Sequence, residues 1–152
     1  MPAHRSLIRP TEPLPVRSDD DAVELLALAV TEPMEPEVLC FVLDASGRGS
    51  TLFVVDDIHG PDAVLDVADL MCRAAEGSPA RYLVVASTRP DGGLEPDDDW
   101  RFAELDALAT SSGLDLLEWY VITSGEWVRA SQRLAVPNRP DEPWHRDWCD
   151  QS

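Results

Sequence analysis

The chain has 152 residues, 44% of them apolar, which is enough for one domain with a sizeable buried core. The formal net charge is −17, and all 12 basic residues are arginine. Such acidity argues against binding of nucleic acids, whose phosphate backbones attract Lys and Arg. The three cysteines form no C-x-x-C pair, and no apolar stretch reaches membrane-spanning length. These features predict a cytoplasmic protein without a disulfide framework.

The N-terminal part of the chain predicts a flexible tail followed by a helix. Residues 1–17 are rich in proline and arginine and lack hydrophobic periodicity, which is typical of a tail. Ser18 and Asp21 have the spacing of a helix-capping box, and apolar residues at helical spacing follow them. We therefore expect a helix that begins at Ser18 and ends before the prolines of the segment TEPMEP.

The next segment predicts a hairpin, a helix and a buried strand. The apolar runs Val38–Leu43 and Leu52–Val55 flank the turn DASGRG, as the two strands of a hairpin do. The segment GPD at 60–62 predicts the start of a helix, with its proline at the first helical position. Residues 80–87 are almost all apolar, which favours a strand covered on both faces.

The last predicted elements complete an α/β domain. After a loop at 88–96, Asp97 caps a helix that Gly113 ends, and the strand LDLLEWYVIT turns into the short strand EWVRAS. Residues 134–152 are again polar and rich in proline and form a predicted C-terminal tail. The order α-β-β-α-β-α-β-β in residues 18–133 predicts a three-layer fold, a mixed β-sheet flanked by helices.

The order of these elements and the segment STRPDGGLEPDDDW resemble the RadC-like branch of the JAB/JAMM metalloprotease family. In that branch a strand ends in His-x-His-Pro-Ser-Gly, and Pro-Ser-x-x-Asp opens the next helix. Pro90, Gly92 and Pro96 match the family's Pro, Gly and Pro with identical spacing. The likeness extends over residues 37–130. It implies the JAB/JAMM (cytidine-deaminase-like) architecture.

The resemblance also implies a zinc site whose ligands are missing here. The family holds zinc with two histidines and an aspartate, keeps a fourth position open for water and uses a glutamate as base. The residues at the three ligand positions are Ser87, Arg89 and Trp100. Asp97 takes the place of the family's serine that helps to hold the reaction intermediate. Glu37 is the one catalytic residue that could be retained, as the base. Arginine stays protonated and tryptophan has no ligand atom. We therefore expect no metal and no cofactor, and no enzymatic activity of the family's kind.

Two alternatives for this degenerate site remain open. Arg89 pairs with Glu37 or Asp97 and fills the place of the metal with a fixed positive charge. Alternatively, Glu37 and the aspartates at 97–99 form an all-oxygen site for Mg²⁺ or Ca²⁺. The simpler interpretation of these aspartates is a helix start whose acidic residues complement the helix dipole.

The C-terminal tail carries two further patterns. His145 and Cys149 would share one face of a helix, but two ligands do not make a metal site. Trp144 and Trp148 have the same spacing and predict an aromatic anchor that docks either on this domain or on a partner.

Three functions follow from these observations. The first is a catalytically inactive JAB/JAMM relative that serves as a binding or scaffold module, with a protein partner or a second copy as a homodimer. The second is a hydrolase that uses a carboxylate-bound divalent ion. The third is binding of a small molecule or peptide in the vacated pocket, lined by Trp100 and Arg89, where an anion would suit Arg89. None of the three involves nucleic acid or a membrane. The final strand, EWVRA, is the predicted open edge of the sheet.

Overall fold

The computed structural model describes residues 6–10, 16, 18–31, 33–56 and 60–133. In chain order the elements of this part are β1 (Ser6–Pro10), α1 (Asp19–Ala29), β2 (Glu37–Asp44), β3 (Gly49–Asp56), α2 (Ala63–Ala74), β4 (Ala80–Arg89), α3 (Asp98–Ser111), β5 (Asp115–Thr123), β6 (Trp127–Arg129) and α4 (Ala130–Arg133). The N-terminal cap of α1 is as predicted, because the Ser18 hydroxyl accepts a hydrogen bond from the Asp21 backbone N–H. No helix in these ranges is both long and apolar enough to cross a membrane.

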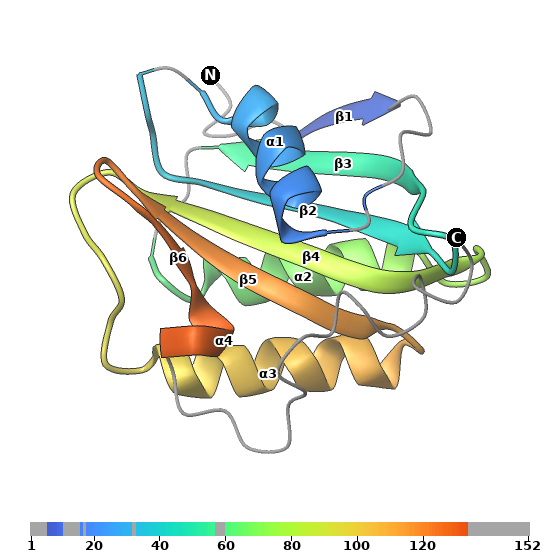
Figure 1. The fold of residues 1–152 in the computed structure, drawn as a ribbon. Helices are drawn as coiled ribbons and strands as arrows, with labels where there is room; N and C mark the ends of the chain where they lie inside the picture. Colours follow the sequence, from blue (N-terminus) through green and yellow to red (C-terminus); the bar gives the residue numbers. More distant parts are fainter. Residues whose placement is uncertain (1–5, 11–15, 17, 32, 57–59, 134–152) are drawn as a thin grey trace.

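One mixed sheet forms the centre of the fold, in the order β1-β3-β2-β4-β5-β6 (Figure 1). Neighbouring strands are antiparallel except β4 and β5, which are parallel. A parallel pair needs a long crossover, and α3 provides it. The mixed α/β sheet is therefore as predicted, and β6 lies at one of its edges as expected.

The helices cover both faces of the sheet. Side chains of a strand alternate between faces, so β2 contributes Val38 and Cys40 to one core and Leu39 and Phe41 to the other. The first core is completed by α2 and α3, and the second by α1. Figure 1 shows α1 on one side of the sheet and α2 with α3 on the other, so the three layers are present.

Four elements differ from the sequence prediction. Residues 6–10, predicted as part of a flexible tail, form β1, which pairs with β3 through its backbone and so needs no hydrophobic pattern. The strand predicted at 80–87 extends to Arg89, because Thr88 and Arg89 still have partners on the neighbouring strands. Helix α2 begins at Ala63, so Pro61 precedes the helix instead of opening it. The short helix α4 was not predicted at all.

Several predicted features lie outside the described residues. They are residues 1–5, 11–15 and 17 of the N-terminal tail, the C-terminal tail at 134–152, and within it His145, Cys149, Trp144 and Trp148. Their predicted roles stay predictions. Val16, also predicted to lie in the flexible tail, is instead buried in the core beside α1, and its backbone N–H donates to the Gly47 carbonyl at 2.6 Å.

Candidate functional site

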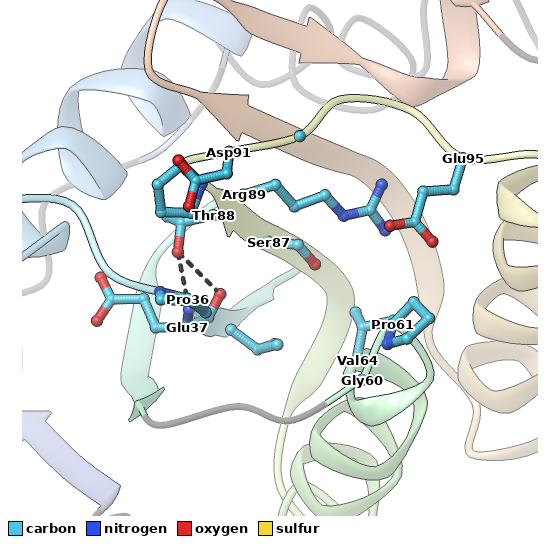
Figure 2. Close-up of a pocket in the computed structure, with 13 residues that line it drawn as sticks. Pro36, Glu37, Gly60, Pro61, Val64, Ser87, Thr88, Arg89, Asp91 and Glu95 are labelled. Carbon is cyan, nitrogen blue, oxygen red and sulfur yellow. Dashed lines mark hydrogen bonds between the residues drawn. The ribbon is translucent and has the colours of Figure 1, made fainter.

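The candidate site lies at the carboxyl end of β4, beside the first residues of β2. The register pairs Glu37 with Thr88 and Val38 with Ser87, so the two strands form one wall of a pocket of about 350 Å³. The loop after β4 and the start of α2 form the other walls (Figure 2). The lining residues are Pro36, Glu37, Val38, Gly60, Pro61, Val64, Ser87, Thr88, Arg89, Pro90, Asp91, Gly92 and Glu95.

Ser87 and Arg89 occupy the two positions that the resemblance assigns to zinc-binding histidines, and both contact Trp119. They are two residues apart on one strand, so they project from the same face. The Ser87 hydroxyl accepts a hydrogen bond from the Trp119 indole N–H at 3.0 Å. The guanidinium carbon of Arg89 lies 5.5 Å from the centre of the Trp119 ring, a cation–π distance. Because an indole N–H only donates, Trp119 cannot take the Ser87 proton and cannot activate this serine as a nucleophile.

The partner of Arg89 is Asp98. Arg89 Nη1 lies 2.7 Å from one carboxylate oxygen of Asp98, and Nη2 lies 3.0 Å from the other. Nη1 also donates to the Gly93 carbonyl at 2.8 Å. The Asp98 side chain is 0% exposed, so this is a buried bidentate ion pair. Arg89 thus carries a fixed positive charge as expected, but the expected partners Glu37 and Asp97 were wrong.

Asp98 is the centre of a larger polar network. It also accepts hydrogen bonds from Arg101 Nη1 at 2.8 Å and from the Glu95 backbone N–H at 2.6 Å. Arg101 in turn donates to Asp62, before α2, at 2.8 Å. Burial alone would raise the pKa of Asp98, but the hydrogen bonds from Arg89, Glu95 and Arg101 outweigh it and hold that pKa below its ordinary value. The network therefore ties the end of β4 to α3 and to the start of α2.

Glu37, the expected remnant base, directs its carboxylate away from Ser87 and Arg89. The carboxylate accepts hydrogen bonds from the Thr31 backbone N–H at 3.0 Å and from the Thr31 hydroxyl at 2.9 Å. In Figure 2 it points to the opposite side from these two residues. The β2 residue opposite Ser87 is Val38. A shift of one residue along a strand moves a side chain to the other face of the sheet, so the sequence placed Glu37 on the wrong face.

The acidic start of α3 does not assemble a metal site. Asp97 is the N-cap residue of α3 and is exposed, with no side-chain capping hydrogen bond. Asp99 is exposed, and its carboxylate accepts a hydrogen bond from the backbone N–H of Trp100. Within the described ranges no three His, Cys, Asp or Glu side chains could hold a metal ion together. The all-oxygen site of Glu37 and these aspartates is therefore not formed, and Ser87 with a paired Arg89 does not fit zinc.

Trp100 does not line the pocket, although the sequence placed it there. Its side chain is 51% exposed on the first turn of α3, whereas Asp98, two residues earlier, faces Arg89. The indole beside the pocket belongs to Trp119, which was not predicted as a site residue because it lies within an apolar strand. Asp98 and Arg101 have the i, i+3 spacing of a helical ion pair, a signal that could have identified the network.

Replacing Glu37 with glutamine is expected to stabilise the fold at neutral pH. Burial is the largest influence on this carboxyl and raises its pKa, although the hydrogen bonds from Thr31 lower it. A raised folded-state pKa means that stability present below the unfolded-state pKa is lost as pH rises through the folded-state pKa. Urea unfolding of Glu37→Gln and of the parent chain should give an advantage to the variant at pH 7 that disappears below pH 4. An equal advantage at both pH values would contradict a raised pKa of the Glu37 carboxyl in the folded state.

The arrangement as a whole is a small pocket with a neutralised cation in its wall and no activated nucleophile among the described side chains. Ser87 is bonded to a donor, Arg89 is bound to Asp98, and the Glu37 carboxylate is bound to Thr31. Such a pocket can hold a ligand, but these residues do not supply a base or a metal for hydrolysis. No protein-family model matches the chain, and no curated protein matches it.

Proposed function

We propose that this chain is a catalytically inactive relative of the RadC-like JAB/JAMM domain that acts as a binding or scaffold module. The resemblance of residues 37–130, with Pro90, Gly92 and Pro96 in the family's spacing, supports the family and its cytidine-deaminase-like architecture. One observation carries the loss of activity: Arg89, at the position of a zinc-binding histidine, is held by both oxygens of the buried Asp98.

The Arg89–Asp98 pair opposes metal binding for two reasons. A guanidinium keeps its proton at all physiological pH values, so it repels a divalent cation instead of binding it. Removing Arg89 from the pair would also leave Asp98 buried with less compensation, and breaking a buried pair is strongly destabilising. Arg89, which stands at the position of a zinc ligand in the family, therefore connects β4 with α3.

The pocket beside this pair supports a binding role. Its volume of about 350 Å³ falls in the range of pockets that hold small ligands or single side chains of a partner. The strong net negative charge supports a role without nucleic acid, and we place the protein in the cytoplasm on the sequence argument alone. The large exposed apolar side chains of the described part, Leu28, Leu70 and Trp100, lie on three different helices, which favours a small ligand over a broad homodimer face.

The proposal is tested by metal analysis and a hydrolysis assay on the full chain, purified without a histidine tag. We expect less than stoichiometric Zn²⁺, Mg²⁺ and Mn²⁺ by elemental analysis. We also expect no cleavage of fluorescent peptide or isopeptide substrates, with or without these ions, in an assay that a zinc protease validates. Metal-dependent cleavage that Ser87→Ala abolishes would contradict the proposal.

A further inference from the structure

Negative charges exceed positive charges around the pocket. Apart from Glu37, whose carboxylate is bound to Thr31, the wall and the network behind it contain four carboxyl groups and two guanidiniums. Both guanidiniums are engaged inside the protein, because Arg89 is bound to Asp98 and Arg101 to Asp62 and Asp98. The charged groups counted here are Asp62, Asp91, Glu95, Asp98, Arg89 and Arg101.

The carboxylates that a ligand can reach stand at the mouth. Asp98 is fully buried, whereas the Glu95 side chain is 42% exposed and Asp91 is also exposed. Figure 2 shows Asp91 and Glu95 on opposite sides of the pocket. Glu95 lies 3.5 Å from Arg101, a longer contact than the 2.8 Å that Arg101 makes with Asp98, so Glu95 is the outer and weaker partner. An anion at the mouth would meet repulsion, and a cation would meet attraction.

The inner wall offers apolar contacts and one hydrogen-bond donor. Val38, Val64 and three prolines line the pocket and would contact an apolar stem. Ser87 is 6% exposed and accepts a hydrogen bond from Trp119, but its own hydrogen has no acceptor within the described residues. A nearly buried hydroxyl whose hydrogen lacks an acceptor in the protein favours a ligand that supplies one.

We propose that this pocket binds a small organic cation: a protonated amine at the mouth, a short apolar stem, and a hydrogen-bond acceptor such as an amide carbonyl at the inner end. The amine meets Asp91 and Glu95, the stem contacts Val38 and Val64, and the acceptor receives the Ser87 hydrogen. This inference rests on the proposed function, since it assigns a ligand class to the same non-catalytic pocket. It replaces the expectation of an anionic ligand, because the charge of Arg89 is already neutralised by Asp98.

The test compares three probes of similar size that differ in charge. They are 4-aminobutanamide as the cation, pentanamide as the neutral analogue and succinamate as the anion. NMR spectra of the ¹⁵N-labelled full chain follow the indole N–H of Trp119, which is bonded to Ser87 in the pocket wall. We expect saturable shifts with the cation and about five-fold weaker binding of pentanamide, the ratio that one exposed ion pair provides. High salt should reduce this ratio.

Variants at the pocket mouth test whether Asp91 and Glu95 cause the preference for the cation. Asp91→Asn and Glu95→Gln, singly and together, remove charge with little change of size, and Glu104→Gln on the exposed face of α3 is the matched control. The double variant should bind 4-aminobutanamide no better than pentanamide, while Glu104→Gln should bind it like the parent chain. Ser87→Ala should weaken both amides and leave the ratio between them unchanged.

The outcomes separate this inference from the proposed function. Equal binding of all three probes, tighter binding of succinamate, or no binding of any probe would each overturn the inference. In those cases a chain that still lacks metal and hydrolytic activity would leave the proposed function standing. Cleavage of the amide probes in a metal-dependent reaction would overturn the proposed function itself.

Discussion

Replacing Asp98 with asparagine is expected to lower the free energy of unfolding by about 3 kcal/mol, because it removes the carboxylate that pairs with the nearly buried Arg89, while Arg101 keeps its pair with Asp62. The Asp98 side chain is fully buried and receives hydrogen bonds from Arg89, Arg101 and the Glu95 backbone N–H. Asparagine keeps the size of the side chain but presents an amide N–H₂ to at least one of these donors. Urea unfolding at pH 7 measures the loss as a lower midpoint at an unchanged slope.

The neighbouring Asp99 provides the matched control for Asp98. It lies in the same helical turn but is exposed, so Asp99→Asn should change stability by no more than about 0.5 kcal/mol. The pKa of Asp98 is lowered in the folded state, so its contribution is present above its unfolded-state pKa and is lost as pH falls through the folded-state pKa. The parent chain should therefore lose stability on acidification more steeply than Asp98→Asn. Equal losses of unfolding free energy for Asp98→Asn and Asp99→Asn at pH 7 would contradict a stabilising role for the buried ion pairs of Asp98.

A second large effect is expected at Glu118 in β5, which pairs in register with Val84 of β4. Its carboxylate is fully buried and accepts hydrogen bonds from Arg129 Nε at 3.2 Å, from the Ser131 backbone N–H at 3.0 Å and from the Ser131 hydroxyl. These contacts hold β6 and α4 on β5. Glu118→Gln removes the nearer of two counter-charges of the part-buried Arg129, which keeps Asp19 at 3.4 Å, and it weakens the buried hydrogen bonds to Ser131. The expected cost is about 2 kcal/mol, measured by urea unfolding.

The control for Glu118 is a glutamate on the adjacent turn. Glu126 pairs with Arg133 at 3.2 Å, but both side chains are more than half exposed. Solvent screens such a pair, so Glu126→Gln should cost less than about 1 kcal/mol. A loss at Glu126 as large as that at Glu118 would show that burial does not control the strength of these pairs.

The sequence predicted the elements whose pattern depends on burial. The apolar runs of β2, β4 and β5 mark strands covered on both faces, and Ser18 with Asp21 marks the cap of α1. It missed β1, because an edge strand that pairs through its backbone needs no alternating pattern. The exact ends of strands were also missed, since Thr88 and Arg89 are polar yet remain paired in the sheet.

The candidate site was harder to predict, because its chemistry depends on side-chain direction. A family pattern places Glu37 and Trp100 in the site, but Glu37 projects from the other face of the sheet and Trp100 projects into solvent. The residue opposite Ser87 is Val38 instead of Glu37, and the residue that faces Arg89 is Asp98 instead of Trp100. Choosing among several adjacent acids for the partner of Arg89 requires the phase of α3 relative to β4, which one sequence does not provide.

The coupling energy between Arg89 and Asp98 measures most directly whether Asp98 neutralises Arg89 in the pocket wall. Unfolding free energies of the parent chain, Arg89→Met, Asp98→Asn and the double variant form a double-mutant cycle. We expect a coupling of about 2 kcal/mol, because the double variant no longer holds an uncompensated charge at either position. Additive losses, with a coupling near zero, would mean that Arg89 is not committed to Asp98. Its charge would then be available in the pocket, and both the proposed loss of activity and the preference for a cation would lose their foundation.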